Sequence, residues 1–148
     1  MIRDKVIRKI PLPNPPNLID YAQSTSQFSW DQARNEMQGL PLNKGLNIAH
    51  EAVDRHANGD LKNHLALCWL GKNNTRKNFT YSDLKKLSNK FANVLRGLRL
   101  TNGDSVFVLT GRIPELYISA LGAWKNKNVF CPLFSAFGPE PIHSRLSL

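Results

Sequence analysis

Two short apolar runs flank an amphipathic segment between residues 105 and 133, and this arrangement constrains the fold more than any other feature. Residues 105–110 and 129–133 are rich in β-branched and aromatic side chains, which is typical of buried strands. Between them, Pro114 suits a first helical turn, and residues 114–126 carry an apolar stripe at helical spacing. A strand, a helix and a second strand within about 30 residues form a βαβ unit with parallel strands. The sequence therefore predicts an α/β fold.

A second pair of strands is predicted upstream, as a hairpin. Residues 65–70 form a continuous apolar run, residues 72–74 resemble a turn, and residues 78–81 resume an extended pattern. Thr80 and Asp83 have the spacing of a helix cap, so a helix is expected to begin after them. The apolar stripe of this helix predicts an inward face made of Leu84, Leu87, Phe91, Val94, Leu95 and Leu98.

The N-terminal part of the chain shows less regularity. Residues 1–27 contain four prolines between positions 11 and 16. Because proline lacks an amide donor and disfavours helix in its neighbour, an extended or mobile arm is expected. Ser29 has capping-box spacing to the glutamine three residues later, which predicts a short helix over 30–37. Asn47 is a candidate N-cap for a further helix over 47–57.

The C-terminal residues begin another helix that the chain does not complete. Pro139 and Glu140 occupy its first turn, where both residue types are favoured. No further strand follows, so the predicted sheet is incomplete and keeps an open edge and an open apolar face. We therefore expect self-association, or a complementing chain that covers the open sheet.

The charge balance is strongly basic, with 20 Lys and Arg against 11 Asp and Glu, a net charge of +9 and a pI near 9.9. Such a balance raises nucleic acid, an anionic membrane and a phosphorylated ligand as partners. The basic residues are scattered without a run of five or six, so a solvated face explains most of them. The aromatic residues mostly lie in apolar stripes rather than among basic residues, which disfavours nucleic acid.

The sequence also bears on location. No apolar run approaches the roughly 20 residues that cross a bilayer, so no membrane partner is expected. The basic start lacks the apolar stretch of a secretory signal. Cys68 and Cys131 each lie in an apolar run, where two buried thiols fit a reducing compartment better than a disulfide. A cytoplasmic location is predicted.

The sequence contains no recognisable phosphate-binding, metal-binding or catalytic motif. The nine glycines are never closer than six positions apart, which excludes the common glycine-rich phosphate loops. His50 and His56 are six positions apart and would point to different sides of a helix, so no metal site is predicted. No nucleophile elbow and no outstanding pair of carboxylates occur, so no catalytic residue is expected.

Five segments, taken in order, carry a resemblance to a known family. They are 47–57 (NIAHEAVDRHA), 78–84 (NFTYSDL), 89–98 (NKFANVLRGL), 103–109 (GDSVFVL) and 112–137 (RIPELYISALGAWKNKNVFCPLFSAF). In this order and spacing they resemble the N-terminal part of AMP-forming acetyl-CoA synthetases, which belong to the adenylate-forming acyl-CoA synthetase superfamily. The acetate-activating branch fits better than fatty-acyl or luciferase-like branches.

The resemblance covers residues 28–148 and implies a partial N-terminal domain of an AMP-dependent synthetase/ligase, preceded by the arm of residues 1–27. Complete relatives use ATP, Mg and CoA to convert acetate, through an acetyl-adenylate, into acetyl-CoA. Their ATP-phosphate loop and catalytic lysine have no counterpart in this sequence, so the chain alone is expected to be an inactive fragment without a cofactor of its own.

One ligand-binding segment of the family falls inside the chain. By resemblance, the loop after the strand 129–133 approaches CoA, and Phe134, Ser135 and Ala136 occupy the matching positions. Some relatives have glycine at the latter two positions, which bears on how closely a ligand can approach the backbone. The alternative is that Leu133, Phe134 and Phe137 only cover the end of the sheet. Tyr117 and Trp124 are expected to be core residues of the crossover helix.

Two positions where relatives have glycine carry Arg99 and Lys127 here, each just past a predicted helix end. A left-handed residue closes a helix at such a position, so we expect backbone strain at both residues, with Asn126 or Asn128 as an alternative cap.

Two other functions stay open. The chain could be a small basic α/β module that binds nucleic acid or a phosphorylated ligand, or a degenerate remnant without a biochemical role.

Overall fold

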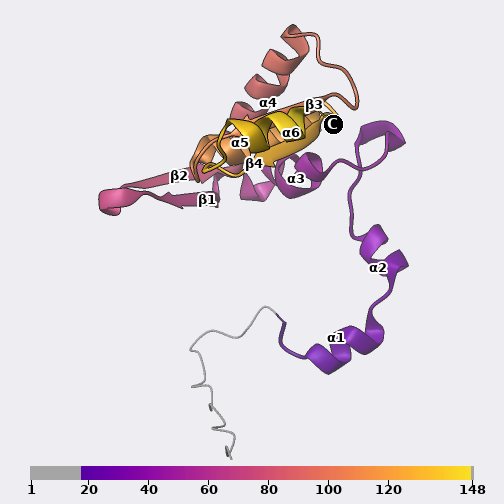
Figure 1. Cartoon of the computed structure of the whole chain (residues 1–148). Helices are drawn as coiled ribbons and strands as arrows, with labels where there is room; N and C mark the ends of the chain where they lie inside the picture. Colours follow the sequence, from indigo (N-terminus) through magenta and orange to yellow (C-terminus); the bar gives the residue numbers. More distant parts are fainter. Residues whose placement is uncertain (1–17, 148) are drawn as a thin grey trace, which may run out of the picture. The chain divides into compact units, whose positions relative to one another are not determined.

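The computed structural model describes residues 18–147 (Figure 1). It divides the chain into two units, residues 1–36 and 37–148. The first unit contains two short helices, α1 (Tyr21–Gln27) and α2 (Trp30–Asn35). The Ser29 hydroxyl accepts a hydrogen bond from the Gln32 amide, which confirms the cap predicted for α2.

The sequence predicts an extended or mobile arm over residues 1–27; residues 21–27 of this segment form helix α1 and are therefore not extended. The Asp20 carboxylate accepts a hydrogen bond from the Gln23 amide at 2.8 Å and caps the helix start. The prolines that suggested an extended arm end at position 16, before this cap. Residues 1–17 of the predicted arm lie outside the described residues. The proposed boundary at residue 28 stays a prediction.

The second unit begins with a helical segment that differs from an ideal α-helix. Asn47 caps it as predicted, because its Oδ1 accepts hydrogen bonds from the amides of Ala49 and His50. Residues His50–Asp54 then form a wide π-turn, labelled η2, before α3 (Arg55–Ala57) continues the segment. Such π-turns are rare in proteins, and those that occur are often found at functional sites.

The predicted hairpin is confirmed. Strand β1 (Leu65–Leu70) pairs antiparallel with β2 (Arg76–Thr80), and Figure 1 shows the hairpin projecting from the second unit. The prediction that both thiols are buried is wrong, because Cys68 is exposed and Cys131 is only half-buried. Cys68 stands opposite the exposed Asn78 on a face of the hairpin that no second layer covers among the described residues. Three 3-10 turns complete the connections: η1 (Pro41–Asn43), η3 (Asp60–Asn63) and η4 (Lys72–Asn74).

Helix α4 (Tyr81–Gly97) begins with the capping box predicted at Thr80 and Asp83. Its buried face, however, is not the whole stripe of large apolar residues. Ser88 and Ala92 are buried together with Leu84 and Leu95, whereas Val94 and Leu98 are exposed. The reason is a close contact with a neighbouring helix, which admits only small side chains.

Helix α5 (Pro114–Lys125) lies against α4 through Gly122. A Cβ atom at Gly122 would lie 2.8 Å from the Ser88 carbonyl oxygen and 2.8 Å from a ring carbon of Phe91. The two helix backbones therefore approach more closely than any residue other than glycine would permit at this position. This contact turns the small side chains of α4 inward and leaves part of its large apolar residues outside.

The predicted βαβ unit is confirmed. Strands β3 (Ser105–Leu109) and β4 (Val129–Leu133) are parallel, with Phe107 opposite Cys131. Helix α5 connects them, and α6 (Pro139–Leu146) follows β4. Each predicted boundary lies within one residue of the observed one. The rings of Trp124 and Phe130 meet edge to face with centroids 6.0 Å apart, which packs α5 on one face of the strand pair.

The other face of the strand pair is open among residues 18–147. Phe107 and Leu109 of β3 and Val129 of β4 are exposed on it, as the incomplete sheet predicts. The sheets β1–β2 and β3–β4 have two strands each. Tyr117 is 47% exposed, so the prediction of a core role for it is wrong, because no layer in the described part of the chain covers this side chain. One buried cluster of the core consists of Ala49, Val53, Leu84 and Leu121, with half-buried residues packed against it that include Leu67, Phe79 and Trp124.

The two predicted left-handed positions are confirmed, with φ of 64° at Arg99 and 63° at Lys127. Both form Schellman closures: the Leu100 amide donates to the Leu95 carbonyl, and the Asn128 amide donates to the Ala123 carbonyl. Asn126 keeps φ of −84° and does not take over the cap. The side chains of Asn126 and Asn128 instead donate to the carbonyls of Leu100 and Thr101, which ties the two helix ends together.

Candidate functional site

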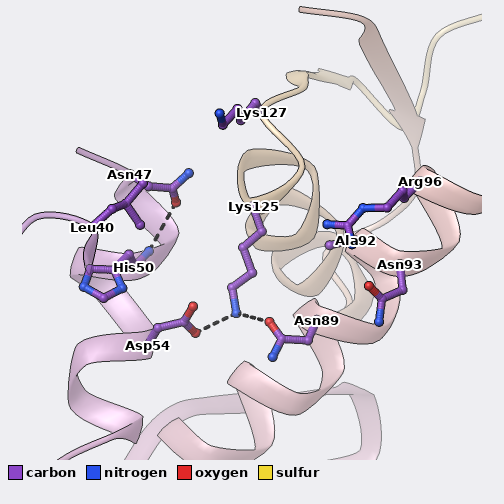
Figure 2. Close-up of a pocket in the computed structure, with 10 residues that line it drawn as sticks. All are labelled: Leu40, Asn47, His50, Asp54, Asn89, Ala92, Asn93, Arg96, Lys125 and Lys127. Carbon is purple, nitrogen blue, oxygen red and sulfur yellow. Dashed lines mark hydrogen bonds and ion pairs between the residues drawn. The ribbon is translucent and has the colours of Figure 1, made fainter. Parts of the chain in front are cut away.

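A pocket of about 360 Å³ opens where η2, α4 and the end of α5 meet (Figure 2). Most of the side chains that line it are polar, and they come from segments far apart in the sequence. The lining residues are Leu40, Asn47, His50, Asp54, Asn89, Ala92, Asn93, Arg96, Lys125 and Lys127.

Lys125 forms the polar centre of the pocket. Its Nζ lies 2.6 Å from Asp54 Oδ1 and donates to Asn89 Oδ1 at 2.8 Å. Figure 2 shows the side chain reaching from α5 to both partners. The side chains of Lys125 and Asp54 are 10% and 19% exposed, so the ion pair is largely removed from water. Burial lowers the pKa of Lys125, and the hydrogen bond and charge of Asp54 offset part of this effect.

Asn47 and His50 form the wall on the side of η2. Asn47 Nδ2 donates to the Trp124 carbonyl at 2.8 Å, so this residue links the start of the helical segment to the end of α5. His50 is 9% exposed, and its Nε2 is buried without a hydrogen-bond partner among residues 18–147. Leu40 closes the pocket beside them, in a loop that Glu51 holds by accepting hydrogen bonds from the amides of Gln38 and Gly39.

The rim on the opposite side is cationic. Arg96 lies in the last turn of α4, and Lys127 is the left-handed residue after α5. Within residues 18–147, neither side chain has a hydrogen bond or an ion pair, and the same is true of Asn93. Figure 2 shows Asn89, Asn93 and Arg96 along α4 with Lys127 across the opening. The pocket thus presents several unused hydrogen-bond donors.

The structure places the predicted loop residues elsewhere, between β4 and α6. Phe134 is 64% exposed, and Ser135 and Ala136 are exposed with it. The loop is a tight turn, because the Phe137 amide donates to the Phe134 carbonyl at 2.9 Å. Neither Ser135 nor Ala136 has a positive φ, so the turn does not require glycine. Leu133 and Phe137, the other two residues of the alternative in which this segment covers the end of the sheet, are half-buried, and both interpretations of the loop stay predictions.

Aromatic and cationic groups support this loop from α6. The rings of Phe134 and Phe137 meet edge to face with centroids 5.6 Å apart. The Arg145 guanidinium lies 4.3 Å from the centroid of the Phe137 ring and donates to the Pro141 carbonyl. No local sequence pattern predicts this role for Arg145, because Arg145 and Phe137 come together only through the turn before α6.

Residues 18–147 contain no group of three or more His, Cys, Asp or Glu side chains arranged to hold a metal ion. In the same part of the chain, every helix is too short or too polar to cross a membrane.

The sequence and the fold fall within a known protein class. Residues 53–148 match the AMP-binding enzyme family, and because this match covers more than half of the chain, the chain belongs to that family. The relatives are synthetases. The acetyl-coenzyme A synthetase of Bacillus subtilis is 37% identical over 131 residues, which are 88% of this chain and 23% of that protein. The acetyl-coenzyme A synthetase of Leptospira biflexa serovar Patoc is 37% identical over 102 residues, 68% of this chain and 16% of that protein.

A solved structure supports the same assignment. The crystal structure of Brucella canis acyl-CoA synthetase superposes with a TM-score of 0.76 at 35% identity, covering 86% of this chain and 23% of that one. The chain therefore matches a small N-terminal part of its relatives, about a fifth of their length.

Proposed function

We propose that this chain supplies the N-terminal part of the large domain of an acetate-activating, AMP-forming synthetase. The observation that carries the proposal is the joint match in sequence and fold, which extends over 86–88% of the chain. By the resemblance, the complete enzyme would use ATP, Mg and CoA to form acetyl-CoA through an acetyl-adenylate. The proposal includes the cytoplasmic location that the sequence predicts.

The chain alone is proposed to be inactive, because its sequence contains neither the ATP-phosphate loop nor the catalytic lysine of complete relatives. The test is acetate-dependent exchange of pyrophosphate into ATP by the purified chain, with the Bacillus subtilis relative as the positive control. The expected result is no exchange above a sample without protein. Clear exchange would contradict the proposal, because it would require an ATP site in these 148 residues.

The open apolar surface is proposed to be covered by the part of the large domain that relatives possess beyond the matched segment. Besides the open face of β3–β4, a groove of about 520 Å³ runs beside α4, with apolar walls that include Phe79, Phe91 and Val94. Burial of such surface contributes about 25 cal/mol per Å², which favours a covering polypeptide or self-association.

Mixing the chain with the remaining part of the Bacillus subtilis relative tests this proposal. The expected result is a complex in sedimentation and the appearance of exchange activity. Val94→Asp, in the groove, should abolish the complex, whereas Ser82→Asp, at an exposed position of α4 outside the groove, should not. Equal complex formation by both variants would contradict a role for the groove.

Phe134, Ser135 and Ala136 are proposed to contact CoA in the assembled enzyme. The support is the exposed aromatic ring of Phe134, held on a tight turn and backed by Phe137. In the assembled enzyme, Phe134→Ala should raise the KM for CoA and leave the pyrophosphate exchange unchanged, since exchange precedes CoA. A loss of exchange without a change in the KM for CoA would contradict this role.

A further inference from the structure

We propose that the pocket between η2, α4 and α5 binds a small phosphorylated ligand through its phosphate group, with Arg96 and Lys127 as the charged donors. The proposal concerns residues of this chain alone and does not rest on the proposed synthetase function.

The unpaired hydrogen-bonding groups of the pocket favour an anionic ligand. Asp54, the only carboxylate in the lining, is already paired with Lys125. The groups left over are mainly donors: the Arg96 guanidinium, the Lys127 ammonium and the side-chain amide of Asn93, each without a partner within residues 18–147. Oxygen atoms of a phosphate group accept from guanidinium and ammonium donors in short, charge-assisted hydrogen bonds. A phosphate group therefore matches what the pocket leaves unsatisfied.

The net charge of the pocket supports the same conclusion. The charges of Asp54 and Lys125 cancel, which leaves the two positive charges of Arg96 and Lys127. The C-terminal ends of α4 and α5 oppose them, each with roughly half a negative charge. The balance is about one positive charge.

Lys127 has a left-handed backbone, as does Arg99, but of these two residues Lys127 lines the pocket. Its φ of 63° is a conformation that costs a residue other than glycine roughly 1 kcal/mol or more. Strained positions of this kind are concentrated at functional sites. Here the strained backbone carries a cation at the mouth of a pocket, and the adjoining π-turn positions Asp54 to hold Lys125 (Figure 2).

The size of the pocket limits the ligand. A volume of about 360 Å³ lies at the lower end of the roughly 300–1,000 Å³ typical of ligand pockets. Inorganic phosphate or a phosphate monoester such as AMP fits this range, whereas the opening is not a long groove that would follow a nucleic-acid backbone.

The test is calorimetric titration of the full chain with inorganic phosphate and, separately, with AMP, against chloride at equal ionic strength. The expected result is saturable phosphate binding with a Kd of about 1 mM. Arg96→Gln and Lys127→Asn should each weaken it about tenfold, because each removes one charge-assisted contact. Asparagine tolerates the left-handed conformation, so the second variant keeps the fold. Lys90→Gln, on α4 but in the other groove, removes the same charge and should leave the Kd unchanged.

Each possible result either supports the phosphate site or overturns it. Tighter binding of AMP than of inorganic phosphate would identify a monoester as the ligand, and equal binding would identify phosphate itself; both support the site. Absence of saturable binding up to about 20 mM phosphate would overturn the proposal. Equal weakening by Lys90→Gln would also overturn it, because the effect would then be one of total charge. So would duplex DNA binding that survives near 200 mM salt and requires Arg96, since nucleic acid would then be the ligand.

Discussion

Replacement of Arg99 by glycine should stabilise the protein, and the structure sets the size of the effect. Arg99 closes α4 with φ of 64°, where a Cβ atom costs about 1–2 kcal/mol. Glycine removes this cost, but its greater backbone entropy stabilises the unfolded chain by about 0.4–1 kcal/mol. The net gain in the free energy of unfolding should therefore be about 0.5–1 kcal/mol, or about 2–4 °C in Tm for a unit of this size.

The assay is urea denaturation of the full chain, followed by circular dichroism, with Arg99→Ala as the matched control. Alanine removes the same charge and the same side chain but keeps the Cβ atom. Arg99→Ala should therefore leave the midpoint unchanged, since the Arg99 side chain is exposed and unpaired within residues 18–147. If alanine stabilises the chain as much as glycine, the side chain and not the backbone is the source, and the reasoning is refuted.

Three further predictions concern packing, the buried ion pair and acid stability. Gly122→Ala should destabilise the chain by about 1–3 kcal/mol, measured in the same assay, because the new Cβ atom meets backbone at 2.8 Å. Asp54→Asn should cost about 3 kcal/mol because it leaves Lys125 buried without its anion, whereas Lys125→Met should cost less; the reverse order of midpoints would contradict this. Hydrogen bonds from the Thr80 hydroxyl and amide hold the pKa of Asp83 below its ordinary value of 3.8. The stabilisation it provides is therefore complete above that value and is lost as the pH falls through the lowered pKa of Asp83, so wild type and Asp83→Asn should converge in stability at the acid end of the titration.

The sequence predicts those parts of the fold that depend on interactions between residues close together in the chain. The capping box at Thr80 and Asp83 involves residues three apart, and the left-handed closures at Arg99 and Lys127 follow from the helix ends beside them. The βαβ unit likewise shows in hydrophobic periodicity over a short stretch. The cap at Asp20 was also local, but the neighbouring prolines concealed it.

The pocket could not be predicted in this way, because its contacts join distant residues. Lys125 and Asp54 are 71 positions apart, and Asn47 and the Trp124 carbonyl are 77 apart. No local pattern relates these residues, and the π-turn that positions Asp54 has no sequence signature that we recognise. The buried face of α4 was misassigned for a similar reason, since it depends on a glycine in another helix.

The Gly122 contact also bears on how the nascent chain behaves during synthesis. Ser88 precedes Gly122 by 34 positions (122 − 88), so at about 5–20 residues per second α4 waits seconds for its partner after leaving the ribosome. The surface of α4 that receives α5 carries Ser88, Ala92 and part of Phe91, which contacts Gly122. Phe91 and Val94 also line the groove, together with Glu115 and Ile118 of α5. The groove is therefore complete only after α5 has docked, and a partner that recognises the whole groove can bind α4 only after that step.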